Sequence, residues 1–349
     1  MMSSYISTLA WTSPARNAIP RLQSELSRAS TELSTGRHAD VGLTLGVRSA
    51  ESVGLYLERG EIDSMTQSNA QTRSFVDRTQ MSLAQLTTDA SAFLKELVVG
   101  QSDDSGGQTV QSQAKLALSA FISSMNASDG QRYLFAGVNS AVQPLADYET
   151  SPKTAVNSAF ATKFGLSATD PQNDPAVSQI AASDMEAFLD NEFADLFADP
   201  AWGTAWSSAS STNLTSRISS TERVTISANA NAPAMRNLAM ALTMVAELGT
   251  ANLSDSAREV VLKKATGLAG GSITSFTGMA TSLGVSQIRL DVADEAMRKT
   301  LDVVNSRVNA LEGVDPAEAK TRMDTLSTQL EMSYATTAKI MQLSILNYV

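Results

Sequence analysis

LGVSQIRLDVADEAMRKTLDVVNSRVNAL, residues 283–311, is the stretch that decides the fold. Its apolar residues recur at alternating steps of four and three, the heptad spacing of a helix that packs along a partner helix. The seam positions are Leu283, Gln287, Leu290, Asp294, Met297, Leu301, Val304, Val308 and Leu311. Seven of these nine positions are apolar. We therefore expect a long helix that lies lengthwise against another.

A second stripe follows a break at Gly313–Pro316 and reaches almost to the last residue. Its positions are Met323, Leu326, Leu330, Tyr334, Thr337, Met341, Ile345 and Tyr348. A single terminal helix is only marginally stable in water without a partner, and chain ends usually fray. We therefore expect this stripe to be buried against the N-terminal helix and against neighbouring subunits.

The N-terminal segment carries a matching stripe. Ser13-Pro14 is a suitable helix start, Pro20 should kink the helix or move its start, and Gly36 should end it. The apolar positions are Ile19, Leu22, Leu26, Ala29 and Leu33. The residues that we expect to mediate assembly are Ile19, Leu22, Leu26, Leu33, Met323, Leu326, Leu330, Tyr334, Met341, Ile345 and Tyr348.

A long helix is predicted from about Ala50 to Val99, after a loop that includes Gly42 and Gly46. At 1.5 Å per residue it would span roughly 75 Å. Its seam is Ile62, Met65, Asn69, Thr72, Val76, Thr79, Leu83, Leu86, Ala90, Phe93 and Leu97. We expect an intramolecular core formed by Ile62, Leu83, Leu86, Phe93, Leu290, Met297, Leu301, Val304, Val308 and Leu311.

The middle of the chain has a different texture. A helix at 110–127 precedes a predicted strand at 131–138, and prolines then interrupt the pattern up to Asn231. In that region we expect a helix at 181–197 and strands at 156–164 and 224–226. Helices resume after Pro233 and again from near Ser254, with Gly267–Gly271 as a candidate interruption.

The predicted fold is mainly α: a long antiparallel coiled-coil rod of N- and C-terminal arms with a small mixed α/β inserted domain. The expected domains are an N-terminal assembly helix and loop (1–49) and the first half of the rod with a short strand (50–139). The inserted domain (140–225), the second half of the rod (226–313) and the C-terminal assembly helix (314–349) follow.

Composition excludes several classes of function. A net charge of −10 argues against nucleic-acid binding, which needs a basic face. With no cysteine and only His38, thiolate and multi-histidine metal sites are excluded, so we expect no cofactor and no metal. The first twenty residues lack the pattern of a cleaved signal, and no apolar run is long enough for a membrane-spanning helix.

Candidate chemical sites are weak. His38 has no nucleophile or acid at a recognisable spacing, and the acidic residues between Asp184 and Asp199 lack the order of an EF-hand loop. Gly267–Ser272 has no lysine in the position of a phosphate-binding loop. Trp202 and Trp206 are better explained as core residues than as ligand contacts. We expect no catalytic residue and no enzyme.

Four stretches resemble the flagellin superfamily, in the right order and over both helical arms. Leu33–Arg37 resembles the step that ends the first helix, and Asp129–Gly137 resembles the strand of junction proteins. Ile226–Ala241 resembles the return into the C-terminal arm, and Ala338–Val349 resembles the terminal helix. The segment Asp40–Gly46 departs from the family pattern.

The resemblance implies a structural subunit that assembles helically at the hook–filament junction of the bacterial flagellum. It implies export without a cleaved signal, with an export chaperone before assembly. The neighbours would be further copies of this chain, hook-associated protein 1 and flagellin. The middle domain would face outward, with no nucleic acid and no membrane insertion.

Two other readings stay open. The chain could be flagellin itself, which has the same arms and forms the filament. It could also be a secreted coiled-coil adhesin or fibre protein, although such proteins usually have a cleavable signal or a trimeric core of Ile and Leu.

Overall fold

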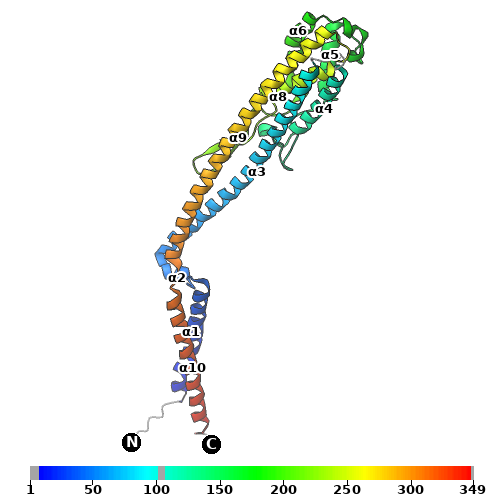
Figure 1. Cartoon of the computed structure of the whole chain (residues 1–349). Helices are drawn as coiled ribbons and strands as arrows, with labels where there is room; N and C mark the ends of the chain where they lie inside the picture. Colours follow the sequence, from blue (N-terminus) through cyan, green and yellow to red (C-terminus); the bar gives the residue numbers. More distant parts are fainter. Residues whose placement is uncertain (1–7, 101–106, 347–349) are drawn as a thin grey trace, which may run out of the picture. The chain divides into compact units, whose positions relative to one another are not determined.

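The computed structural model describes residues 8–100 and 107–346, and it confirms a mainly α fold with a small two-stranded sheet. The long helices are α1 (Thr8–Thr35), α3 (Ser49–Gly100, 52 residues), α9 (Asp255–Glu312, 58 residues) and α10 (Pro316–Leu346). The chain divides into two compact units (Figure 1). Unit 1 holds residues 1–64 and 296–349, and unit 2 holds residues 65–295.

In unit 1, α1 and α10 lie side by side and antiparallel (Figure 1). Between α1 and α3 lie α2 (Val41–Leu45) and the 3₁₀ turn η1 (Gly46–Arg48). The start of α3 packs against the end of α9. That contact buries one side chain of α3 and three of α9: Leu55, Val304, Val308 and Leu311.

Unit 2 surrounds a nearly fully buried helix, α8 (Pro233–Glu247). It packs against α4 (Gly107–Met125) and shares one apolar core with α3 and α9. The inserted region adds α5 (Ser151–Phe164), α6 (Ala182–Asp190) and α7 (Glu192–Asp195). Short helical turns are η2 (Gly137–Asn139), η3 (Pro171–Asn173), η4 (Pro175–Gln179) and η5 (Trp202–Trp206).

The predicted strand at 224–226 is confirmed as β2 (Arg223–Thr225), which pairs antiparallel with β1 (Thr215–Arg217). The hairpin is joined to both long helices of unit 2. Asn69 on α3 donates its Nδ2 to the carbonyl of Ile218 at 3.0 Å, and Ser286 on α9 donates its hydroxyl to the carbonyl of Thr225 at 2.7 Å. The hairpin therefore ties α3 to α9.

Two predicted strands are wrong. Residues 131–138 form turns with isolated bridges, because positive φ angles at Gly130 and Gly137 reverse the chain at both ends. Residues 156–164 belong to α5, which starts at Ser151-Pro152 and ends at Gly165 in the left-handed conformation. Its apolar run fits a helix because Val156 and Phe160 are four residues apart and both buried.

A predicted helix start and a predicted interruption are also wrong. Helix α1 is helical through Pro14 and Pro20, so the helix starts at neither proline. Pro20 is exposed on this helix. Helix α9 continues through Gly267–Gly271, where glycine costs helix stability without breaking the helix.

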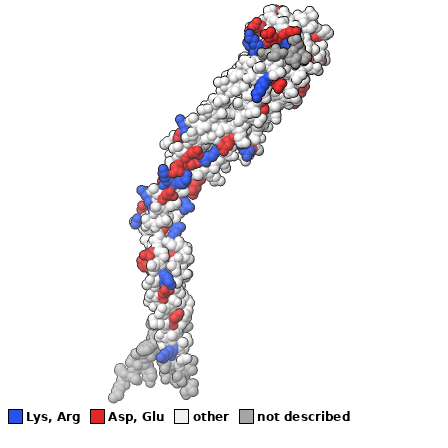
Figure 2. All heavy atoms as spheres, viewed as in Figure 1, with Lys and Arg blue, Asp and Glu red and all other residues white. Residues whose placement is uncertain are grey.

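Helix α9 carries no charged side chain between Lys264 and Arg289, and this part of unit 2 is mostly white in Figure 2. Most hydroxyls of this part of α9 donate within the helix. Five of them donate to the carbonyl four residues earlier, at 2.9–3.3 Å: Thr274, Ser275, Thr277, Thr281 and Ser282.

Candidate assembly surface on the terminal helices

Among the side chains that the structure describes on α1 and α10, the contact between the two helices has a small apolar core. Leu22, Ala29 and Leu326 are buried in it, and Leu26, Met323 and Leu330 pack around them half-buried. The core is thin because the alternating heptad positions further along α10 are small or polar, with Ser333 and Thr337 half-buried. Two helices joined by so few apolar side chains are marginally stable without further contacts.

The buried face of α10 follows a strict alternation of four and three from Ala319. It contains Ala319, Met323, Leu326, Leu330, Ser333, Thr337 and Ile340, all buried or half-buried. Tyr334 and Met341 lie one position off this face and are 47% and 50% exposed. The Tyr334 hydroxyl accepts a hydrogen bond from Gln23 Nε2 at 2.8 Å. Tyr334 and Met341 are therefore available at the edge of the helix pair.

The other predicted assembly residues fall into two groups. Ile19 and Leu33 are half-buried on α1, on the side that carries Leu22 and Leu26. The side chain of Ile345 and all of Tyr348 lie outside the described residues. Met332, a further apolar side chain on the outer side of α10, is 57% exposed. It is absent from the predicted assembly residues, although its place outside the heptad seam could have indicated an exposed apolar side chain.

The predicted rod-core residues divide between the two units. Leu83, Leu86, Phe93 and Leu290 are buried in the core of unit 2. Val304, Val308 and Leu311 are buried in unit 1. Ile62, Met297 and Leu301 are half-buried.

Polar seam positions on α3 have a structural use that spacing alone does not reveal. Asn69 also donates to Asp294 Oδ1 at 2.7 Å, and the hydroxyls of Thr72 and Ser216 lie 2.9 Å apart. Arg73 forms ion pairs with Asp291 at 2.6 Å and Asp294 at 3.0 Å. These contacts fix the register of α3 against α9 and the hairpin within unit 2.

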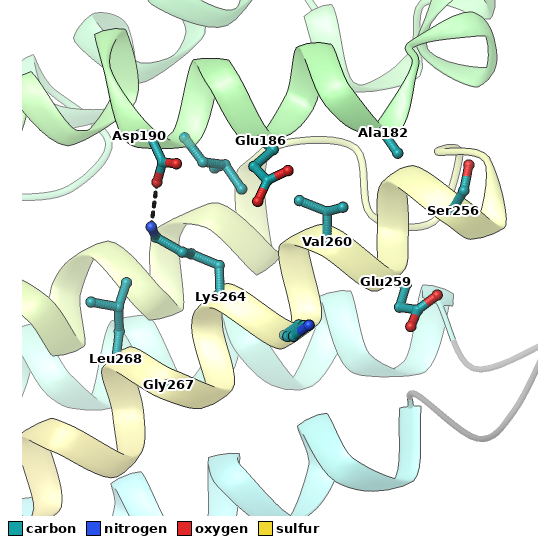
Figure 3. A pocket seen from close by; sticks show the side chains of 11 residues that line it. Ala182, Glu186, Asp190, Ser256, Glu259, Val260, Lys264, Gly267 and Leu268 are labelled. Carbon is teal, nitrogen blue, oxygen red and sulfur yellow. Dashed lines mark hydrogen bonds and ion pairs between the residues drawn. The ribbon is translucent and has the colours of Figure 1, made fainter.

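A groove of about 700 Å³ lies between α6 and α9 (Figure 3). Asp190 and Lys264 form an ion pair across it, while Leu189, Val260 and Leu268 supply apolar lining. The lining contains carboxylates, lysines and one serine but no histidine, and no base is bonded to the serine. The serine of this lining is therefore not activated as a nucleophile by a neighbouring base.

Among the described residues, no group of three or more His, Cys, Asp or Glu side chains is placed to hold a metal ion. No helix in the described ranges is both long and apolar enough to cross a membrane.

The most deeply buried acid of unit 2 is Glu247, at the end of α8 and 3% exposed. Burial raises the pKa of its carboxyl, although Lys115, Lys153 and a hydrogen bond from Gln172 oppose that shift. Burial and the nearby Glu247 also raise the pKa of the Tyr148 hydroxyl, which has no hydrogen-bond partner. Because α8 is packed on all sides, this acid influences stability and is not open to a substrate.

Comparison with known proteins bears on both ends of the chain. The model of the bacterial flagellin N-terminal helical region matches residues 6–140, and that of the C-terminal helical region matches residues 266–349. No curated protein sequence matches the chain.

Two of the solved structures that resemble the chain are flagellar proteins. The crystal structure of Bacillus cereus FlgL is 10% identical with a TM-score of 0.48, covering 74% of this chain and 99% of that one. A putative flagellar hook-associated protein from Vibrio parahaemolyticus is 11% identical with a TM-score of 0.46, covering 76% and 97%. The two flagellin models together match more than half of the sequence. The chain belongs to the flagellin family.

Proposed function

We propose that this chain is a structural subunit of the bacterial flagellum that joins hook to filament, the role of hook-associated protein 3. The observation that carries the proposal is the pair of terminal helices, of which α1 lies in the N-terminal flagellin match and α10 in the C-terminal one. These helices share a thin core and leave Met332, Tyr334 and Met341 exposed on α10. Burial of those side chains between neighbours would stabilise the pair, which couples its order to assembly.

The proposal includes further copies of this chain as the main partner, with hook-associated protein 1 and flagellin as neighbours and a chaperone before export. Residues 140–225 would face outward. The subunit would act by assembly and not by catalysis. The motif at Asp129–Gly137 favours the junction role over flagellin proper, which remains the second candidate.

Deletion of the gene tests the role in the cell. We expect hooks without filaments and flagellin released into the medium. Immunogold labelling should then mark the base of the filament in the parent strain. Label along the whole filament would identify the chain as flagellin, and normal filaments in the deletion strain would exclude both roles.

The assembly surface is tested with purified protein. Replacement of Tyr334 and Met341 by serine should leave the helical content of the monomer unchanged, because both side chains are about half exposed. Sedimentation of polymers should fall at least tenfold, since roughly 1–2 kcal/mol of apolar burial would be lost at each contact. The control is Leu116→Ser on α4, which is 65% exposed. Equal polymer yields from the double variant and the control would refute the surface.

A further inference from the structure

Two chain reversals meet within unit 1. Helix α1 is followed by Gly36, which has a φ of +69°, and α9 is followed by Gly313. The amide of His38 donates to the carbonyl of Glu312 at 2.9 Å, and the amide of Val314 donates to the carbonyl of Gly36 at 3.0 Å. These two bonds join the ends of α1 and α9 in a short antiparallel bridge.

A buried carboxylate lies on one side of this bridge. Glu312 is 1% exposed. Its Oε1 accepts a hydrogen bond from the Ser52 hydroxyl, and its Oε2 accepts from the Tyr56 hydroxyl at 3.0 Å and from Arg37 Nη2. The Arg37 guanidinium also lies over the Tyr56 ring, 5.5 Å from its centroid. One carboxylate thus holds α3, α9 and the segment after α1.

A second carboxylate lies toward the terminal helices. Glu32 on α1 is 9% exposed. Its Oε2 accepts a hydrogen bond from Arg322 Nη1 on α10 at 3.0 Å, and its Oε1 accepts from the amide of Ala39 at 3.3 Å. His38 Nδ1 lies 3.9 Å from the same Oε1. Glu32 therefore holds α1, α10 and the segment after α1.

The apolar side chains that the structure describes in unit 1 do not supply this connection. One apolar cluster contains Leu55 and the end of α9, and a separate one contains Leu22, Ala29 and Leu326. The link between the two clusters is made by the bridge and by six polar side chains. We call these the polar latch: Glu32, Arg37, Ser52, Tyr56, Glu312 and Arg322.

We propose that the polar latch is a conformational coupling device, in which the charge of Glu312 keeps α1 and α10 ordered together. The Glu312 side chain is 1% exposed and the Arg37 side chain 44%, so loss of the Arg37 charge leaves a buried carboxylate without its cation. Loss of the Glu312 charge weakens the hydrogen bonds from Ser52 and Tyr56. Breaking a buried ion pair from one side strongly destabilises the elements that it joins. Because the α1–α10 core is thin, that helix pair opens as a unit. The device regulates the helix pair on which the proposed assembly rests.

Hydrogen exchange on the full-length monomer tests the polar latch. The variants Glu312→Gln and Arg37→Gln each break the ion pair between these two residues. Both variants should raise exchange about tenfold or more in amides far from the substitutions, at 22–29 on α1 and 319–330 on α10. Amides at 76–93 in unit 2 should keep their protection. The control is Glu51→Gln on α3, which removes an exposed ion pair with Arg48 in the same unit.

Three outcomes would overturn the proposal. They are unchanged exchange on α1 and α10, an increase confined to the residues beside the bridge, and an equal increase in unit 2. Sedimentation of the wild-type polymer is measured separately. Failure of the wild-type chain to assemble would count against the proposed function, while the exchange result would still decide the latch.

Discussion

Gly137 shows how one residue can fix a turn. Its φ is +60°, and an added Cβ would lie 2.4 Å from the carbonyl oxygen of Ser210 and 2.6 Å from that of Thr212. Both neighbours are backbone atoms, so they cannot rotate away. Replacement by alanine should lower the free energy of unfolding of unit 2 by about 2–3 kcal/mol, as measured by urea denaturation.

Gly165→Ala is the matched control for Gly137→Ala. Gly165 has a φ of +67° but no atom within 4 Å of the added Cβ. Gly165→Ala should lower the free energy of unfolding by only about 1 kcal/mol, the cost of placing alanine in the left-handed backbone conformation. Equal losses at the two positions would show that the close approach at Gly137 is unimportant.

The raised pKa of Glu247 predicts how the stability of unit 2 changes with pH. Its pKa is raised in the folded protein, so its neutral form is favoured there and stability falls as pH rises above the ordinary value of 4.5. Glu247→Gln keeps the size and removes the charge. It should raise the Tm at pH 7.5 by about 2–4 °C, the shift that 1 kcal/mol produces in a domain of this size.

The Tm difference between Glu247→Gln and wild type should shrink toward pH 5, as followed by circular dichroism. Glu186→Gln, an exposed acid on α6, should leave the profile unchanged. A Tm difference that stays constant with pH would contradict the assignment to the Glu247 carboxyl.

Residue-scale prediction from the sequence is best supported where many turns of helix agree and weakest where one turn decides. Leu83, Leu86 and Leu290 were predicted as core and are buried. On α10, Ser333 and Tyr334 both fit an alternation of three and four. The partner helix, which the spacing does not encode, puts Ser333 inward and Tyr334 at the edge. Glu312 was not predicted at all, because a charged residue after a seam usually marks an exposed helix end.

At the scale of elements, loss of the hairpin β1–β2 should affect both long helices of unit 2, because the hairpin is hydrogen-bonded to α3 and to α9. Ile218 is fully buried, and its carbonyl accepts the hydrogen bond from Asn69. Ile218→Ala should cost about 2–4 kcal/mol through lost contacts and a cavity. Hydrogen exchange should report faster opening of the hairpin and of α3 near Thr72.

The control for Ile218→Ala is Thr221→Ala, at an exposed position of the same hairpin. It should behave like wild type. Unchanged exchange in the Ile218 variant would mean that the hairpin does not hold the two long helices together.

The long helices could be predicted because a heptad pattern sustained over many turns has no alternative in a strand. The short elements could not. Residues 131–138 and 156–164 are apolar runs of about the same length, and one forms turns while the other forms a helix. Pro152 in the first turn and the left-handed C-cap Gly165 favour the helix in the second case, and two positive φ angles decide the first.

At the scale of the whole chain, the two units should differ in resistance to protease. Unit 2 has one large core, whereas three side chains are buried between α1 and α10 in the part of these helices whose side chains the structure describes. Limited proteolysis of the monomer should remove about the first 35 and last 35 residues first. Mass spectrometry should find a stable fragment that contains Met65–Glu295. Full protection of both ends in a verified monomer would refute this expectation.

The internal hydroxyl bonds of α9 have a consequence for hydration. A serine or threonine that donates to its own helix does not need water for its proton, and it turns methyl and methylene groups outward. Because α9 has no charged side chain between Lys264 and Arg289, few strong hydrogen bonds to water are lost when another surface covers this part of the helix. Desolvation, the usual penalty for burying polar sequence, is therefore small along this part of α9.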